Sequence, residues 1–313
     1  MRYHSILPAL VFADLTLHYE YLALAAAACW AVGSLLSAQA STYLGAFSFT
    51  RWRMLCASVM LWFIVAINGG WHSLALGSST VLVLSGVIGI FVGDTALFAA
   101  MNRLGPRRAG VLFATHSLFS VVLAYFFLGE TQWGWTLIGS SLLISGVMVA
   151  ILFGKRKTEL HAWESNQTEL RSGIALGLLA ALCQAIATLM LKPVMTTDID
   201  PVAASAVRMT SAFMLHQIVF MLGFKVAKAY MPLTAKVFML VLVNAALSMV
   251  LGMTLILQAL KYGDAGMVAI LSSVSPVMIL PLLWLVYKRS PALGAWLGAL
   301  LTLLGTILIL LKD

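Results

Sequence analysis

The stretch GVIGIFVGDTALFAA, residues 86–100, combines a stripe of small residues with a single carboxylate inside an otherwise apolar segment. Small residues spaced three, four, three and four apart lie on one face of an α-helix. In lipid such a face lets helix backbones approach closely, because van der Waals contact replaces the hydrophobic drive. The stretch therefore predicts a tightly packed membrane helix, with this face formed by Gly86, Gly89, Gly93, Ala96 and Ala100.

The composition of the whole chain also indicates a membrane protein. Of its 313 residues, 62% are hydrophobic and 10% are charged, whereas about a quarter of the residues of a soluble domain are charged. Apolar runs of roughly twenty residues, each long enough to cross about 30 Å of hydrocarbon, recur along nearly the whole chain. We predict an all-α integral membrane protein with ten transmembrane helices, at 21–39, 47–67, 81–101, 109–128, 132–153, 173–195, 203–224, 236–258, 266–287 and 292–311.

The small-residue stripe has a counterpart in the second half of the chain. The same spacing recurs at Ala245, Ser248, Gly252, Leu255 and Ala259. Other matches follow at offsets of 154 and 155 residues, and a period of this length indicates a duplicated unit. They pair ACW at 28–30 with LCQ at 182–184, and RM at 53–54 with RM at 208–209.

The repeat divides the chain into four parts. We predict a first five-helix repeat over residues 20–154 and a second over residues 173–313. An N-terminal interfacial segment, 1–19, precedes them, and a polar linker, 155–172, joins them. Because five crossings are an odd number, the second repeat must run in the opposite sense to the first. Two inverted five-helix repeats are an arrangement found in many secondary transporters.

The basic residues predict an orientation, because Lys and Arg favour the cytoplasmic side of a membrane. Loops after the odd-numbered spans contain fourteen of them, and Arg208 lies within a span. The other side, which includes both termini, contains four: Arg2, Lys192, Lys261 and Lys312. This bias places both termini outside the cytoplasm. The fourteen are Arg51, Arg53, Arg103, Arg107, Arg108, Lys155, Arg156, Lys157, Arg171, Lys225, Lys228, Lys236, Lys288 and Arg289.

Several functional classes receive no support from the sequence. The net charge of +8 does not indicate a nucleic-acid partner, because the basic residues are dispersed and no aromatic–basic module is present. The six histidines are dispersed, and neither H-E-x-x-H nor the phosphate loop G-x-x-x-x-G-K-[ST] occurs. The three cysteines fall inside predicted spans, so no disulfide framework is implied. We predict no catalytic residues, no metal site and no cofactor.

The chain resembles the EamA-type branch of the drug/metabolite transporter superfamily over residues 20–311. The resemblance rests on Trp30, on Arg53, on the glycine-rich third span, on LGE at 128–130 and on ALKYGDAGMVAILSSVSPV at 259–277. It implies a multi-pass exporter or exchanger of small solutes in a bacterial inner membrane, with spans five and ten peripheral. Members of the family often keep their termini in the cytoplasm, contrary to the charge count. The second half ends its ninth span with YKR instead of a glutamate, so only a local structural role is expected for Glu130.

Asp94 is the only acidic residue deep inside a predicted span. A carboxylate at the centre of a membrane helix costs about 2.5 to 3.5 kcal/mol on insertion scales, so it usually faces a protein interior with a partner. One interpretation is a hydrogen bond that ties the third span to a neighbour. The other is a coupling site that exchanges a proton or meets a cationic group of the substrate. The repeat-equivalent residue is Met253, which shows that the fold does not require a carboxylate at this position.

Arg53 and Arg208 occupy matching positions near the starts of two spans. Residues kept in both halves can be architectural, with the long side chain reaching the interface or capping a helix. Alternatively, their guanidinium groups bind a carboxylate or phosphate of the substrate in bidentate geometry.

Further polar residues complete the predicted substrate-binding set. His116 is replaced by Val274 in the other half, which favours function, although a buried hydrogen-bonding strut is the alternative. Gln184 matches Trp30, so we expect an indole on one pocket wall and an amide on the other. Asn244 and Ser275 join them. The full predicted set is Trp30, Arg53, Asp94, His116, Gln184, Arg208, Asn244 and Ser275.

We therefore predict a secondary transporter that exports or exchanges a small polar or amphipathic metabolite, such as an amino acid or drug-like compound, by alternating access. Its partners are the substrate, the lipid bilayer and, as the candidate coupling ion, protons. Two other classes remain as alternatives. An integral-membrane enzyme acting on lipid would need a cluster of catalytic groups at one membrane face. A non-transporting membrane scaffold would not explain why a carboxylate, Asp94, lies deep inside a span.

Overall fold

The computed structural model describes residues 18–131, 133–153, 167–287 and 292–310. Over these residues every regular element is a helix, which confirms the all-α prediction. Most of the predicted interfacial segment 1–19 and most of the linker 155–172 lie outside the described residues. The helix after the linker begins at Gln167, six residues before the predicted start of the second repeat, because a polar first turn can extend a helix beyond the apolar region.

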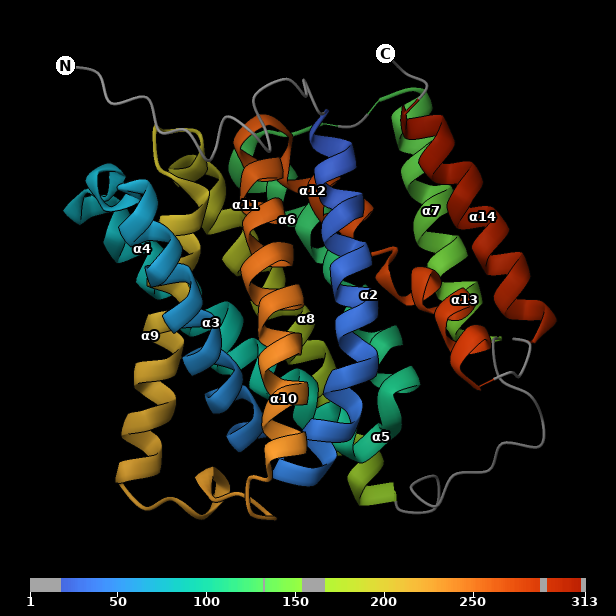
Figure 1. Cartoon of the computed structure of the whole chain (residues 1–313). Coiled ribbons are helices and arrows are strands. Elements are labelled where there is room, and N and C mark those ends of the chain that lie inside the picture. The colour runs from blue at the N-terminus through green and yellow to red at the C-terminus, as the bar shows by residue number, and fades with distance from the viewer. Residues whose placement is uncertain (1–17, 132, 154–166, 288–291, 311–313) are drawn as a thin grey trace.

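The elements of the two repeats follow each other in the same order (Figure 1). The first contains α2 (Tyr19–Leu44), α3 (Ala46–Asn68), η1 (Gly70–Ser73), α4 (Leu76–Gly86), η2 (Val87–Asp94), α5 (Thr95–Ala114), α6 (His116–Leu128) and α7 (Trp135–Leu152). The second contains α8 (Gln167–Met195), α9 (Pro201–Met221), η4 (Lys225–Ala227), α10 (Ala235–Asn244), η5 (Ala245–Gly252), α11 (Met253–Tyr262), α12 (Ala265–Ser272), α13 (Ser275–Tyr287) and α14 (Leu293–Leu310).

Eight stretches among the described residues are long and apolar enough to cross a membrane. The two remaining predicted spans are helical but fall outside this group. In α7 the apolar part, Trp135–Ala150, is shorter. In α9 the length is 21 residues, but Arg208, His216 and Gln217 lower its hydropathy. The side chains of Arg208 and His216 are buried, so the polar part of α9 faces protein and not lipid.

The third span of each repeat contains an eight-residue π-helix in its middle. The first joins α4 through η2 to α5, and the second joins α10 through η5 to α11. A π-helix is a wider turn that interrupts the regular ladder and is often found at functional sites. The third span continues to Gly105, where φ is 80° and the chain turns into the fourth span. The two π-helices end within one repeat position of each other: η2 ends at Asp94, and η5 ends at Gly252, directly before Met253, the counterpart of Asp94.

The predicted continuous fourth and ninth spans are each broken in the middle. The first break lies at Thr115, between α5 and α6, and the second lies between α12 and α13. The hydroxyl of Thr115 donates to the carbonyl of Leu112 at 2.6 Å, and the hydroxyl of Ser273 donates to that of Ile270 at 2.7 Å. Serine and threonine side chains that bind a carbonyl three residues back compete with the helical ladder, which favours a bend at both positions.

Contacts between the halves are reciprocal. The π-helix η2 packs on α8 and η5 packs on α2, while α5 contacts α8 and α11 contacts α2. The broken spans follow the same rule, since α6 contacts α8 and α12 contacts α2. The pairs α3–α9 and α7–α14 each join equivalent helices of the two halves. This pattern is that of two repeats related by an approximate two-fold axis.

The helices α7 and α14 form a pair at the side of the bundle (Figure 1). Their backbones approach through glycine: a Cβ added at Gly146 would lie 2.4 Å from the amide nitrogen of Thr302, and one at Gly298 would lie 2.1 Å from that of Ala150. The predicted peripheral position of the fifth and tenth spans agrees with this arrangement. The core that holds the polar residues lies instead between α2, α3, α8, α9 and the two π-containing spans.

Candidate functional site

Asp94 is the last residue of η2, and its carboxylate forms an ion pair with Arg53 of α3. The bond runs from Nη2 of Arg53 to Oδ2 of Asp94, and the two side chains are 4% and 13% exposed. The guanidinium of Arg53 lies over the ring of Phe98 at 4.7 Å and over that of Phe49 at 5.3 Å. An aromatic face stabilises a desolvated cation. The structure therefore brings together two of the predicted site residues.

Arg208 of α9 approaches the same span, α4 and η2, from the other repeat. Its Nε donates to Oγ of Ser85 at 3.1 Å, and its Nη1 contacts Sδ of Met253 at 2.9 Å. Met253 is the repeat counterpart of Asp94. Each arginine therefore contacts the equivalent residue of its own half, Asp94 in the first and Met253 in the second. In the second half that residue carries no charge.

The small-residue stripe makes this approach possible. A Cβ added at Gly86 would lie 2.6 Å from the backbone oxygen of Arg208, and one at Gly89 would lie 2.7 Å from Cβ of Ala187 and 3.4 Å from Nη2 of Arg208. Since real Cβ atoms do not come that close to backbone, α9 can pack here only against glycine. The predicted close contact of residues 86–100 is thus made with α8 and α9, and it fixes Arg208 beside η2.

His216 belongs to the same region, although the sequence analysis did not place it in the site. Its Nδ1 lies 2.7 Å from the carbonyl of Ala212, so Nδ1 is the donor, and Nε2 accepts from the hydroxyl of Thr95 at 2.9 Å. The ring also packs at 4.6 Å from that of Phe47 and at 4.7 Å from that of Phe91. We call Arg53, Asp94, Thr95, Arg208 and His216 the central polar cluster.

Trp30 and Asn244 lie together in a second group, where α2 crosses η5. The indole nitrogen of Trp30 donates to the carbonyl of Ser248 at 2.9 Å, and Nδ2 of Asn244 donates to that of Gly33 at 2.7 Å. Oδ1 of Asn244 is buried without a partner. A Cβ added at Gly252 would lie 2.8 Å from the indole nitrogen, so glycine is required there. These bonds give both side chains a packing role between the two repeats.

The three remaining predicted residues lie elsewhere in the core. His116 begins α6 at the first helix break; it is buried, its Nδ1 has no partner, and its ring is 5.1 Å from that of Phe113. Ser275 begins α13 at the second break and is half-buried. Gln184 is half-buried on α8. The predicted set thus separates into the central polar cluster, the α2–η5 crossing, the two breaks and, by itself on α8, Gln184.

Glu130 has a longer-range role than expected. Its carboxylate oxygens accept bonds from the backbone nitrogens of Ala265 at 2.8 Å and Gly266 at 2.9 Å, which are the first residues of α12. This role does not follow from comparing the ends of the fourth and ninth spans. Glu130 caps a helix of the second repeat, so the second repeat needs no glutamate at the equivalent position. At the same time Nζ of Lys192 donates to the carbonyls of Leu260 and Gly263, at 2.9 and 2.7 Å, at the end of α11.

Comparison with known proteins agrees with this architecture. The model of the EamA-like transporter family matches residues 18–152 and again residues 171–311. The chain belongs to the EamA-like transporter family. The match to both halves confirms the two repeats, and it makes this protein a multi-pass membrane protein of a transporter family.

Solved structures add the fold alone. Twenty-eight chains match, and one of them, titled "Crystal structure of protein", has a TM-score of 0.76 at 15% sequence identity. The alignment covers 94% of this chain and 96% of that chain. Curated proteins give no match. Within the described residues of this EamA-like chain, no group of three metal-binding side chains comes together.

Proposed function

We propose that this protein is a secondary transporter that exports or exchanges a small polar or amphipathic metabolite, such as an amino acid or drug-like compound, across a bacterial inner membrane by alternating access. Support comes from the family, from the duplicated five-helix unit and from the reciprocal contacts between the halves. Transporters built from inverted repeats hold their substrate near the middle of the membrane, where the repeats meet. The central polar cluster lies between elements of both repeats.

The ion pair of Asp94 with Arg53 is the observation that carries the proposal. A buried carboxylate inside a membrane span is costly and is usually functional. We propose that Asp94 is the coupling residue, which releases Arg53 when it takes up a proton and recovers it when the proton leaves. The substrate then competes for the freed groups of the cluster. Trp30, His116, Gln184, Asn244 and Ser275 are proposed to line the substrate path around it.

The two helix breaks are proposed as the moving parts. We propose that a half-helix tilts at Thr115 or at Ser273, where the hydroxyl groups give the carbonyls of Leu112 and Ile270 a side-chain partner in addition to the backbone. The breaks are related by the repeat, so tilting one opens one side of the cluster and tilting the other opens the opposite side. All ten predicted spans are needed for this two-fold arrangement, and α7 and α9 are proposed to cross with the rest.

Proteoliposome counterflow tests the proposal directly. Vesicles loaded with each of the twenty amino acids or an amphipathic drug are diluted into the same labelled compound, and protein-free vesicles serve as the control. We expect labelled solute to accumulate transiently for at least one compound class. A scaffold would give no accumulation for any of them, and an enzyme acting on lipid would change the lipid composition of the vesicles instead.

A further inference from the structure

Arg208 is a buried cation whose hydrogen bonds, within the part of the chain that the structure describes, reach only uncharged groups. The side chain is 1% exposed, and its contacts are the Ser85 hydroxyl and the Met253 thioether. By contrast, the equivalent Arg53 has the carboxylate of Asp94 directly on its guanidinium. A cation inside a membrane protein normally has a counter-charge, because an unpaired one costs several kcal/mol.

The charges of the central polar cluster do not balance. Arg53 and Arg208 contribute two positive charges and Asp94 one negative charge, while His216 uses Nε2 as an acceptor from Thr95. Asp94 is within electrostatic range of both arginines, but its direct bond goes to Arg53. The cluster therefore lacks one negative charge, and the deficit lies at Arg208.

The position of the missing carboxylate is occupied by a side chain that can move. Met253 is 4% exposed and its Sδ lies 2.9 Å from Nη1 of Arg208, at the repeat position that Asp94 fills in the other half. Methionine has three rotatable bonds and repacks easily, and a thioether is only a weak acceptor. A ligand oxygen that displaced it would exchange a weak contact for a charge-assisted hydrogen bond.

We propose that Arg208 binds an anionic group of the transported solute, a carboxylate, and that Met253 swings aside to admit it. The planar guanidinium suits bidentate binding of a carboxylate. The bound anion then does for Arg208 what Asp94 does for Arg53, and the cluster becomes neutral. This assignment rests on the proposed transport function and names the substrate class of the same site.

A substitution that supplies the anion from the protein tests the assignment without a known ligand. Met253→Asp places a carboxylate opposite Arg208, and Met253→Asn is the matched uncharged control. We expect the ligand-free Asp variant in detergent to melt above the Asn variant by about 2 to 4 °C. An Asp variant that melts at or below the temperature of the Asn variant would show that Arg208 lacks no counter-charge.

Transport by the same variants identifies the anion. Counterflow is measured for amino acids and for the corresponding amino acid amides, which lack the α-carboxylate. It is also measured for chloride alone and for inorganic phosphate alone. We expect the acids to exchange and the amides not to, with exchange of the acids falling much further in Met253→Asp than in the uncharged Met253→Asn. Exchange of the amides at the rate of the acids would overturn the assignment and leave the transport function standing. Arg208-dependent exchange of only chloride or phosphate would replace the organic carboxylate by an inorganic anion.

Discussion

At the scale of single residues, two arginines at equivalent positions meet two different partners. Arg53 is bonded to Asp94, whereas Arg208 contacts Met253 and Ser85. The sequence identified both arginines and the lone carboxylate, because charged residues inside apolar spans are rare. It did not reveal which arginine holds the carboxylate, since that depends on how α3, α9 and η2 are turned toward each other.

The ion pair predicts strong coupling between its two members. Asp94→Leu leaves Arg53 buried without its counter-charge and should lower the free energy of unfolding by about 3 to 5 kcal/mol. The double variant Arg53→Leu/Asp94→Leu removes both charges and should recover most of that loss. Reversible unfolding in mixed detergent micelles measures both values. If the loss of unfolding free energy in the double variant equals the sum of the losses in Arg53→Leu and Asp94→Leu, the two side chains are energetically independent.

At the scale of elements, the positions of most helices follow from the apolar runs, but their interruptions do not. The runs give no sign of the π-helices or of the break at Thr115, because a broken span is as apolar as a continuous one. For the break at Ser273 the sequence does contain a signal, since Pro276 follows a group of serines in the ninth span. The sequence also offered no reason to place His216 in the site, since its partner Thr95 is uncharged and lies on another span, 121 residues away in the chain. The small-residue stripe did predict where helices pack closely, because two helix backbones in contact require small residues such as glycine at helical spacing.

Glu130 predicts a measurable tie between the repeats. Glu130→Ala removes both acceptors from the start of α12 and should cost about 0.5 to 2 kcal/mol, as the loss of a helix cap does. The amide hydrogens of Ala265 and Gly266 should exchange with solvent faster, which hydrogen–deuterium exchange detects. Asp200→Ala is the matched control, because Asp200 accepts from the backbone nitrogen of Ala203 at 2.8 Å within its own repeat. Unchanged exchange at α12 in the Glu130 variant would mean that the cap is not maintained in the membrane.

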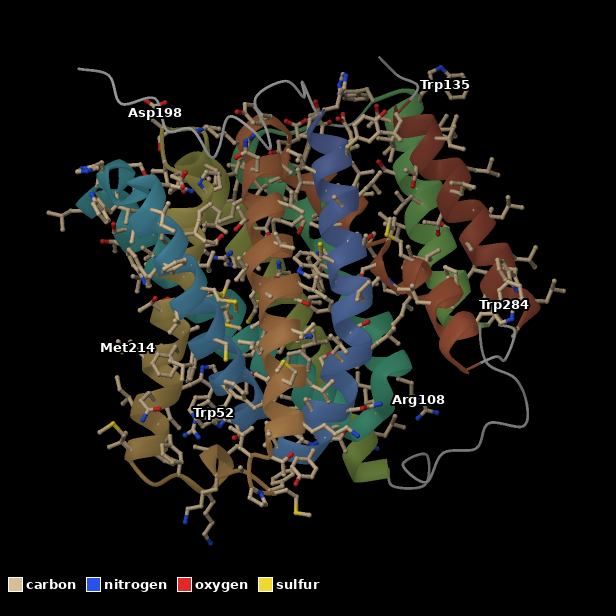
Figure 2. All side chains as sticks on the ribbon, viewed as in Figure 1. Trp52, Arg108, Trp135, Asp198, Met214 and Trp284 are labelled. Carbon is tan, nitrogen blue, oxygen red and sulfur yellow. The ribbon has the colours of Figure 1, made fainter. Side chains whose placement is uncertain are left out.

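At the scale of the whole molecule, the two ends of the bundle can be told apart by labelled side chains. Asp198 and Trp135 lie at one end and Arg108 at the other (Figure 2). The start of α2 and the end of α14 lie at the same end as Asp198 (Figure 1), as an even number of crossings requires. The sequence-based charge count of fourteen against four is a prediction about loops, and one of the fourteen, Arg53, lies inside the bundle against Asp94.

The charge count predicts which end faces the cytoplasm. With Cys29, Cys56 and Cys183 replaced by alanine, cysteines are placed singly at the exposed positions Asp198 and Lys228. In intact cells an impermeant thiol reagent should label position 198 and leave position 228 unlabelled. Permeabilised cells, in which both should react, provide the control. The opposite labelling would place the termini in the cytoplasm, as in many members of the family.

Coupling through Asp94 is the central claim, and gradient-driven transport by Asp94→Asn tests it most directly. Asparagine keeps the size of the side chain and an oxygen for Arg53 but cannot titrate. Proteoliposomes of the parent and the variant are given the solute that counterflow identifies, first at equal pH and then under an imposed pH gradient. We predict that the variant exchanges solute at equal pH as the parent does and fails to accumulate it under the gradient. Accumulation by the variant equal to that of the parent would contradict the account and leave Asp94 as a structural tie between α3 and η2.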